Sequence, residues 1–487
     1  MTSTLIAPPV PVRAARPAAH APAGRFGLAR WGGFAAAAVL AAVTSGVPLP
    51  GLAVTAGGLL AMAGVAAAWL ALGAVAATVP VRRLVAVAAL WASPLLISRP
   101  LFSGDVWSYL AQGLIVARGQ DPYTLGPAQA LGADSAVTRH VSPYWMDTPA
   151  PYGPGWEALS GLVGRLTGEH LAAGVLLYRL VAVAGVLMIA WALPRLARRA
   201  GVPASRAVWL GLLNPLVLWH LVTGVHNDAL MLGLLLAGVE LVLAGAGLGA
   251  PAAAARVVAG FGLITLAANV KVVAAGAGCV LAVHLARRHR RPALTLLLAA
   301  GGGAALTVAI CLGTGLGFGW IEALGSSSGV HSWLAPTNQV GFLIGGAGSL
   351  AGADLTAGAI HAARTAGAVA GAAGAGWVLW RVYRGRTDPL RGIGLLFAVM
   401  VVCGPVLHPW YVLWAILPLA ASARSVREVR RLAGVSVVLA VALPPAGHGV
   451  AALAGGYALA ALVVAAAVPA YRLLSARPAP LLAPLPA

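Results

Sequence analysis

Long apolar runs alternate with short polar segments along most of the chain. An apolar run of about 20 residues is long enough to cross a bilayer as a helix. The pattern therefore predicts an all-α polytopic membrane protein with about 12–14 transmembrane helices. The predicted helices cover residues 33–49, 54–79, 84–98, 171–193, 207–222, 229–249, 258–270, 272–286, 293–316, 358–380, 391–405, 409–422, 432–446 and 449–469.

Some of the apolar runs are too short for ordinary crossings. The pair 258–270 and 272–286 predicts a hairpin of shortened or re-entrant helices with residues 269–271 at its tip, and residues 339–353 predict a further partial helix. The membrane domain as a whole extends over residues 31–470. We expect a disordered cytoplasmic tail at 1–30 and a second cytoplasmic tail at 471–487.

The composition supports a membrane protein. Hydrophobic residues make up 60% of the chain and charged residues 9%, and the mean hydropathy is +0.89. Soluble domains carry about 25% charged residues. The net charge is +20, but the basic residues lie in short clusters between the apolar runs. This pattern indicates orientation in a membrane rather than binding to nucleic acid.

The basic clusters all fall on one side if every predicted helix crosses the membrane, and the positive-inside rule makes that side cytoplasmic. The opposite side then collects the loop 99–170, the turn 224–228, the loop 317–338 and the segment 407–411. Acids, histidines, tryptophans and tyrosines are concentrated there. The asymmetry places any chemistry outside the cytoplasm, on the outer side of a multi-pass plasma-membrane protein.

The loop 99–170 carries six of the twelve acidic residues of the chain. Carboxylates are costly in apolar surroundings, so their concentration in one loop suggests that charge is used there. Residues 104–118 predict a helix, and residues 156–166 predict a short apolar segment after a rigid Pro/Gly turn. We therefore expect an external loop with short helices on the membrane surface.

Asp105 is the first candidate in this loop, because it lies just past an apolar run and is flanked by Trp107 and Tyr109. A carboxylate at the membrane edge can act as a general base on a substrate carried by lipid. The alternative is that Asp105 merely caps the helix 104–118. Position alone does not separate the two interpretations.

Two further polar clusters interrupt apolar runs. His226, Asn227 and Asp228 precede a predicted helix, which they could cap or equip for function. His408 stands before Pro409, and the adjacent Trp410 and Tyr411 also fit an interfacial aromatic belt.

Cations inside apolar stretches form another set. Lys271 is the only lysine of the chain, and it either lines a cavity, where it could bind a lipid phosphate, or extends to a nearby interface. Arg179 lies within a predicted helix near the outer side, and Arg99 precedes the acidic loop. With Tyr152 of the Pro/Gly turn, these are candidate substrate-binding residues.

Several functions are disfavoured by what the sequence lacks. It contains no phosphate-binding GxxxxGK[ST] loop, no GxGxxG motif in a βαβ context and no HExxH motif. The three cysteines form no CxxC pair, so we expect neither a metal site nor a disulfide framework. No long internal repeat is visible, which weakens a transporter interpretation.

The order and spacing of the polar motifs resemble a known family, the actinobacterial polyprenol-phosphate-mannose-dependent α-1,6-mannosyltransferases of lipomannan synthesis. These belong to the GT-C superfamily of membrane glycosyltransferases. The resemblance extends over about residues 30–470. The motifs that carry it are RPLFSGDVWSY at 99–109, DPY at 121–123, DTPAPYGP at 147–154, NPL at 214–216, HND at 226–228 and HPWY at 408–411.

The resemblance implies a GT-C-like helix bundle and an inverting transfer of mannose from polyprenyl-phosphate-mannose to a mannosylated lipid acceptor. The general base of the family matches Asp105, with Asp228 as the second choice for base or acceptor positioning. Lys271, Arg99, Arg179 and His408 are candidates to face the leaving phosphate. No cofactor is required, although a divalent ion bridging Asp105 and the phosphate stays open.

Two alternatives remain. One is another lipid-linked sugar transferase of the same superfamily, such as an arabinofuranosyl or protein O-mannosyl enzyme, because these residues do not identify the sugar. The other is a transporter or flippase, which would spread charged groups through the helix midplanes. The clustering of polar groups at one face favours an enzyme.

Overall fold

The computed structural model describes residues 23–46, 48, 51–245, 249–325, 332–443 and 445, together with a few isolated positions between 454 and 469. The tail at 471–487, most of the predicted helix 449–469 and the first 22 residues lie outside the described residues. Helix α1 (Ala23–Val43) begins well before the predicted start at residue 33 and includes the end of the predicted tail 1–30.

The described part of the chain consists of helices joined by turns and loops. After α1 the helices are α2 (Gly51–Gly73), α3 (Val81–Leu96), α4 (Asp105–Ala117), α5 (Pro127–Leu131), α6 (Pro154–Thr167), α7 (Leu171–Arg199), α8 (Ala204–Leu210), α9 (Asp228–Gly245), α10 (Ala250–Val270), α11 (Ala275–Ala286), α12 (Pro292–Thr314), α13 (Trp320–Ala323), α14 (Pro336–Leu350), α15 (Thr356–Tyr383), α16 (Pro389–Cys403), α17 (Val412–Ala420) and α18 (Val426–Ala442). Short 3₁₀ segments and a π-helix at Val217–Thr223 complete the list.

Six of these helices are long and apolar enough to cross a membrane, namely α1, α2, α7, α9, α10 and α12, and shorter apolar helices lie at 272–286, 389–403 and 409–420. Large apolar side chains are exposed on the outer helices, including Leu297 and Leu298 on α12 at 69% and 67%. A water-facing surface would not hold so many of them, whereas lipid would cover them. The prediction of an all-α polytopic membrane protein is confirmed.

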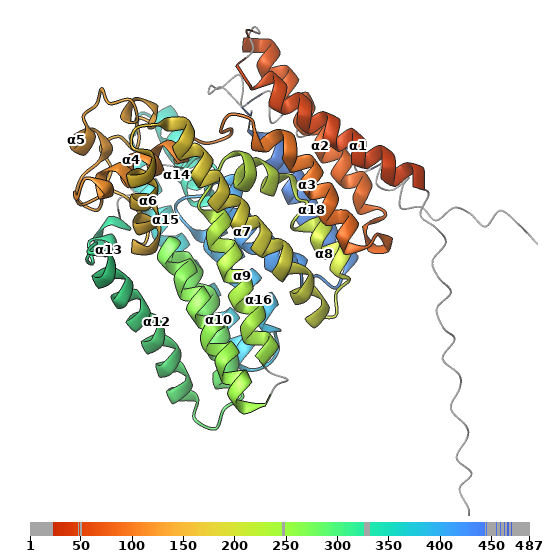
Figure 1. The fold of residues 1–487 in the computed structure, drawn as a ribbon, viewed down its shortest axis with the longest axis vertical. Helices are drawn as coiled ribbons and strands as arrows, with labels where there is room; N and C mark the ends of the chain where they lie inside the picture. The colour runs from red at the N-terminus through yellow and green to blue at the C-terminus, as the bar shows by residue number, and fades with distance from the viewer. Residues whose placement is uncertain are drawn as a thin grey trace, which may run out of the picture.

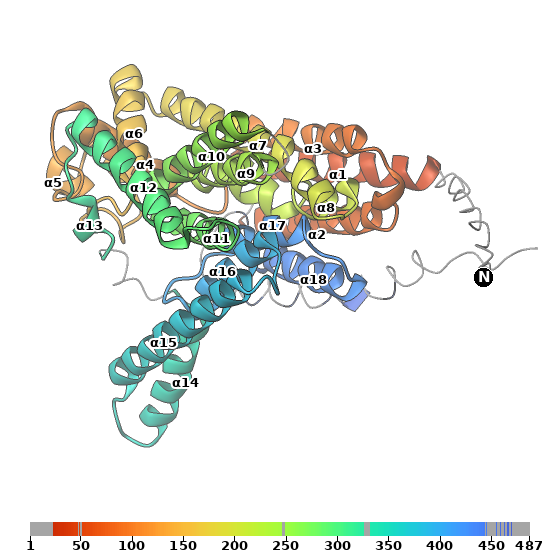
Figure 2. The same ribbon diagram turned by 90° about the horizontal axis from the view of Figure 1, so that it is seen from below.

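Helix α9 is the most buried of the candidate membrane spans, and α10 runs beside it (Figure 1). Helices α1, α2 and α3 pack together on one flank, and α4 to α6 lie on the other (Figure 1). The hairpin of α14 and α15 extends away from the body of the bundle, as Figure 2 shows. The predicted partial helix at 339–353 is thus the first arm of this hairpin.

The predicted helix 207–222 is interrupted. Helix α8 ends at Leu210, and the chain resumes as the π-helix only at Val217. The cause is Asn214 with its following proline: the Asn214 side chain donates to the Leu210 carbonyl at 3.0 Å and accepts from the Leu216 N–H at 3.0 Å. These side-chain bonds replace helical ones that the proline cannot make.

The predicted hairpin 258–286 differs in length from the structure. Helix α10 has 21 residues and is a candidate for a full span, whereas α11 has 12. The chain breaks at Lys271, which is extended with φ −149° and ψ 117°. The Pro/Gly turn of the external loop packs on this break, and the Gly153 N–H donates to the Val270 carbonyl at 3.3 Å.

The loop 99–170 is a packed structure whose main elements are α4 and α6, as the two predicted segments indicated. Their backbones approach closely at glycines, since a Cβ on Gly113 would lie 2.3 Å from the Ser160 carbonyl oxygen. A Cβ on Gly164 would lie 2.4 Å from the Gly113 oxygen. This packing fixes the start of α4, where Asp105 stands.

A similar approach joins α7 to α9, because a Cβ on Gly185 would lie 2.2 Å from the Ala229 carbonyl oxygen. We expect Gly185→Ala to lower the free energy of unfolding by about 1–3 kcal/mol through overpacking. The control is Gly262→Ala on α10, where a Cβ meets nothing within 4 Å. Thermal unfolding in detergent measures both; equal stability of the two variants would contradict the close approach.

Candidate active site

Asp105 is the first residue of α4 and does not cap it. The N-cap residue is Gly104, and no side chain caps the helix. The Asp105 carboxylate instead accepts a hydrogen bond from the Ser103 hydroxyl at 2.7 Å, and its side chain is 23% exposed. This geometry favours the functional interpretation of Asp105 over the capping one.

His226 is the second partner of Asp105, reached from a distant part of the chain. Its Nδ1 lies 3.2 Å from Oδ2 of Asp105, and the histidine is fully buried. The residue before it, Val225, has φ 55°, and Phe102, just before Ser103, has φ 68°. Positive φ is rare for such side chains and concentrates at functional sites. Both strained residues flank the Asp105–His226 pair.

The charge state of Asp105 follows from these neighbours. Burial alone would raise its pKa, but the charge and hydrogen bond of His226 and the hydrogen bond of Ser103 outweigh burial and lower the pKa well below its usual value. Asp105 is therefore an ionised carboxylate at neutral pH.

His408 joins the site through an aromatic stack. Trp410 stacks on His226 with ring centroids 3.8 Å apart and on His408 at 4.5 Å with an interplanar angle of 4°. Burial lowers the pKa of His408 to about 4, so its imidazole is neutral at neutral pH. Pro409 holds His408 in the extended conformation that places it there, with φ −115° and ψ 153°.

Lys271 and Asp228 form a buried ion pair beside this stack. Lys271 Nζ donates to Oδ2 of Asp228 at 2.8 Å, and the indole N–H of Trp414 donates to Oδ1 at 2.6 Å. The ammonium also lies 4.8 Å from the centre of the Tyr411 ring. Because the Lys271 side chain is only 15% exposed, it does not extend to an interface but faces the site.

Tyr109, Tyr152 and Asn227 close the site from the loop side. The Tyr109 hydroxyl accepts from the Asn227 N–H at 3.4 Å, its ring meets Tyr152 edge-on at 5.4 Å, and Tyr152 lies 6.0 Å from Lys271 Nζ. The Asn227 side-chain amide is buried without a hydrogen bond to any described residue, as is the Trp410 indole N–H. Buried polar groups of this kind are suited to a polar ligand.

Three predicted residues are not brought to the site. The guanidinium of Arg179 donates to the Ser98 carbonyl at 2.8 Å and to the Leu96 carbonyl, so it fastens the end of α3. Arg99 lies against the backbone of Gly46, and Trp107 contacts the ring of His140 at 5.0 Å. Among the described residues, no hydrogen bond, ion pair or ring contact joins any of the three to the site residues named above.

The sequence interpretation missed three residues. Ser103 orients Asp105, and Trp414 orients Asp228. Trp414 stands one helical turn after Trp410, a spacing that could have identified it. Glu157 on α6 is fully buried, and neither of its carboxylate oxygens has a hydrogen-bond partner among the described residues. Burial raises its pKa to about 8.

Within the described ranges, no group of three or more His, Cys, Asp or Glu side chains is placed to hold a metal ion. The site offers two carboxylates, two histidines, a buried cation and several aromatic rings. Together with the fold, this defines a polytopic membrane protein with a polar site at one end of its helices.

The family follows from comparison with known proteins. Residues 27–287 match the model of the family described as "Alpha-(1->6)-mannopyranosyltransferase, N-terminal domain", and residues 337–472 match the model described as "MptB C-terminal domain". The chain belongs to this alpha-(1->6)-mannopyranosyltransferase family. No solved structure shows a significant match to the chain.

Relatives from three actinobacteria support the assignment. The chain is 41% identical over 400 residues to an alpha-(1->6)-mannopyranosyltransferase of Mycobacterium tuberculosis, covering 73% of this chain and 67% of the relative. The chain is 39% identical to a probable alpha-(1->6)-mannopyranosyltransferase of Mycolicibacterium smegmatis, and the match covers 68% of this chain and 64% of the relative. The chain is 36% identical to alpha-(1->6)-mannopyranosyltransferase B of Corynebacterium glutamicum, and the match covers 68% of this chain and 57% of the relative. The matched region is thus about two thirds of these relatives or less.

We expect Lys271→Met to lower the free energy of unfolding by about 3–5 kcal/mol, because it leaves the carboxylate of Asp228 buried without a cation. Adding Asp228→Asn removes that charge but keeps an acceptor for Trp414, so the double variant should regain most of the stability. Thermal unfolding measures both variants. A single variant as stable as the native protein would show that the pair is not buried as described.

Glu157 predicts a pH dependence of stability. The pKa of Glu157 is raised on folding. Its contribution to the free energy of unfolding is therefore fully present below the ordinary carboxyl pKa and is lost as the pH rises through about 8. We expect Glu157→Gln to unfold at a temperature that varies less between pH 6 and 9 than that of the native protein. The control is Glu169→Gln, at an exposed residue. If the unfolding temperatures of the native protein and of Glu157→Gln changed with pH in parallel, the burial of an unpaired carboxyl would be contradicted.

Proposed function

We propose that this protein is an inverting α-1,6-mannosyltransferase that moves mannose from polyprenyl-phosphate-mannose to a mannosylated lipid acceptor in lipomannan synthesis. The observation that carries the proposal is the Asp105–His226 pair, in contact at 3.2 Å at the edge of the bundle. The activity for which the relatives are named suggests the linkage, an α-(1→6) mannopyranosyl bond. The polyprenyl phosphate donor rests on the resemblance of the motifs.

The chemistry is a single displacement. The acceptor hydroxyl oxygen attacks the anomeric carbon of mannose, the bond from that carbon to the phosphate oxygen breaks, and the β linkage becomes α. Asp105 takes the hydroxyl proton. A carboxylate with a lowered pKa is a weak base, but an oxocarbenium-like transition state needs the proton only as the new bond nears completion. Ser103 and His226 hold the carboxylate in one orientation.

The leaving phosphate needs positive charge rather than a strong acid. Lys271 uses one N–H bond on Asp228 and has donors left for a phosphate oxygen. The neutral imidazole of His408 is a further donor. We assign Asp228 to positioning rather than to proton transfer, because Lys271 and Trp414 already occupy its two oxygens.

Sugar recognition falls to the aromatic and amide groups. Rings of Trp410, Tyr411 and Tyr152 surround Lys271 and His226. Aromatic faces pack well against the C–H faces of a sugar, while the unpaired amide of Asn227 and indole N–H of Trp410 are suited to its hydroxyl groups. These groups make a carbohydrate a better occupant than an apolar ligand.

The orientation follows from the basic end of the bundle. Arg206 donates to the Ala423 carbonyl, Arg424 to the Ala200 carbonyl, and Arg391 pairs with Glu428, so three arginine-bearing segments meet there. By the positive-inside rule this end faces the cytoplasm of the plasma membrane, and Asp105 faces the outside. Membrane lipids, not nucleic acid, surround the protein.

Replacement of the proposed base, Asp105, tests the proposed function directly. We expect Asp105→Asn to reduce the transfer of mannose from polyprenyl-phosphate-mannose to a short α-1,6-mannoside by about 10²–10⁴-fold, the usual contribution of a positioned base. The matched control is Asp134→Asn, in an exposed part of the same loop. The measurement is radiolabelled transfer by the purified protein, with binding of the donor followed separately.

The same assay separates the alternatives. Transfer that survives EDTA supports a reaction without a divalent ion, and transfer lost with EDTA would assign a metal role to the site. Undiminished transfer by a folded Asp105→Asn protein would overturn the assignment of the base. If the protein used polyprenyl-phosphate-arabinofuranose and not the mannosyl donor, the proposed site would stand, but the transferred sugar would be arabinofuranose.

A further inference from the structure

A second site lies at the basic end of the bundle. A cavity of about 640 Å³ opens between the loop that joins α15 to α16 and the loop that joins α17 to α18. Its wall includes four arginines and two apolar side chains: Arg381, Arg386, Arg391, Arg424, Trp377 and Leu395. We call it the arginine pocket. Its size is typical of ligand sites, which range over roughly 300–1,000 Å³.

The arginine pocket is separate from the candidate active site. Helix α16 begins at Pro389 beside the pocket and ends at Cys403, shortly before His408. Its 15 residues span about 22 Å at 1.5 Å per residue. Helix α17 runs back from the active site to the pocket. The two sites therefore lie at opposite ends of these helices.

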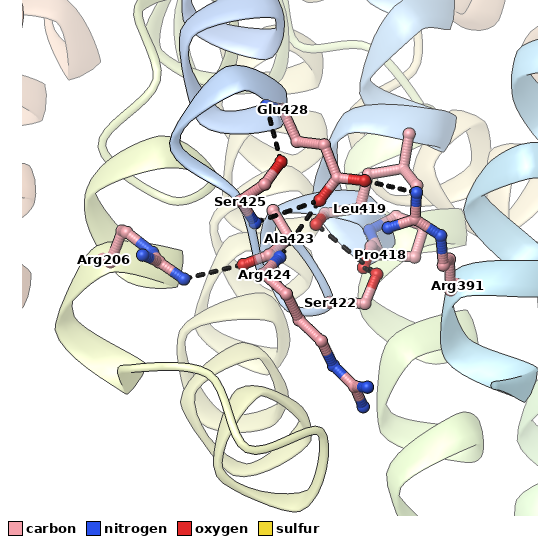
Figure 3. Close-up of polar contacts among 9 residues, drawn as sticks. All are labelled: Arg206, Arg391, Pro418, Leu419, Ser422, Ala423, Arg424, Ser425 and Glu428. Atoms are coloured by element: carbon pink, nitrogen blue, oxygen red, sulfur yellow. Dashed lines mark hydrogen bonds and ion pairs between the residues drawn. The ribbon is translucent and has the colours of Figure 1, made fainter.

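The lining carries excess positive charge, because its two carboxylates are already engaged. Asp388 accepts hydrogen bonds from the first N–H groups of α16, and Glu428 binds Arg391 and the Arg424 N–H (Figure 3). Among the described residues, no carboxylate oxygen lies within 4.0 Å of Arg381, Arg386 or Arg424. Three of the arginines that line the pocket therefore have no carboxylate partner among the described residues.

Neighbouring groups hold these guanidinium groups in place. Arg381 donates to the Thr387 hydroxyl at 3.0 Å and lies 4.8 Å from the centre of the Trp377 ring. Arg424 extends away from Glu428, as Figure 3 shows, and donates to the Ala200 carbonyl at 3.3 Å. Anchoring reduces the entropy that binding would cost, and leaves further N–H donors for a ligand.

The apolar part of the wall indicates the rest of the ligand. Trp377 is 52% exposed, and Leu395 is half-buried on α16. Arginine forks match phosphate oxygens in pairs, and basic pockets between membrane helices bind lipid head groups. We propose that the arginine pocket binds the phosphate group of an anionic membrane lipid, whose acyl chain lies along Trp377 and Leu395.

Lipid binding by the full-length protein in detergent tests this proposal. The probes are dioleoylphosphatidylglycerol, dioleoylphosphatidylcholine, which has the same chains and no net charge, and inorganic phosphate. Native mass spectrometry counts the lipid retained. We expect saturable binding of phosphatidylglycerol, weaker by about 25-fold in Arg381→Gln/Arg386→Gln, because each arginine near the surface contributes about a factor of five. Arg424→Gln, at an exposed residue, should weaken it about fivefold.

The control removes equal charge from the same end of the bundle. Arg82→Gln/Arg83→Gln alters two exposed arginines at the start of α3, outside the pocket, and should bind phosphatidylglycerol like the native protein. If this control lost as much phosphatidylglycerol binding as the pocket variants, the binding would depend on general surface charge, and the proposed site would be overturned. Equal binding of phosphatidylcholine, or displacement of the lipid by millimolar inorganic phosphate, would overturn a lipid phosphate as the ligand.

Discussion

The Asp228–Lys271 ion pair is the interaction on which the rest of the site depends. A carboxylate buried in a bundle of apolar helices is costly unless a cation and hydrogen bonds compensate it. Lys271 supplies the cation and Trp414 the second bond. The pair therefore ties the start of α9, the break after α10 and the helix α17 to one point. Of the groups proposed to meet the donor phosphate, Lys271 lies at that break and His408 lies just before α17.

A second constraint holds the carboxylate of Asp105, the proposed base. Phe102 and Val225 adopt positive φ on either side of the Asp105–His226 contact, and each such residue costs about 1–3 kcal/mol. Packing maintains the strain, since the Phe102 ring stacks on Trp219 at 5.6 Å. The strained backbone turns Ser103 and His226 toward the same carboxylate. Stability of the bundle is thus used to fix the geometry of the site.

Much of the site could be predicted from sequence because its signals are local. Polar groups that interrupt apolar runs are costly, so Asp105, the 226–228 cluster, Lys271 and His408 stood out without any knowledge of contacts. The all-α membrane class followed from the lengths of the runs. The same reasoning did not reveal the contacts of Arg179, because the carbonyl groups that it binds, those of Leu96 and Ser98, lie at and just after the end of α3, some eighty positions earlier in the chain. No local pattern reveals such a partner.

The break at Asn214 and the unpaired Glu157 were missed for related reasons. A run of apolar residues predicts a helix, but the Asn214 side chain competes for its backbone groups. Glu157 appears in the sequence as one of several loop acids, and only the packing of α4 on α6 shows it to be buried. Burial that arises between elements is set by tertiary structure and leaves little trace in the order of residues.

The most direct test of the central claim is a structure of the Asp105→Asn protein with polyprenyl-phosphate-mannose bound. The account predicts the phosphate within hydrogen-bonding distance of Lys271, the mannose against Trp410 or Tyr411, and its anomeric carbon facing the substituted side chain. Donor bound at the other end of α16, or with its phosphate turned away from Lys271, would contradict the account.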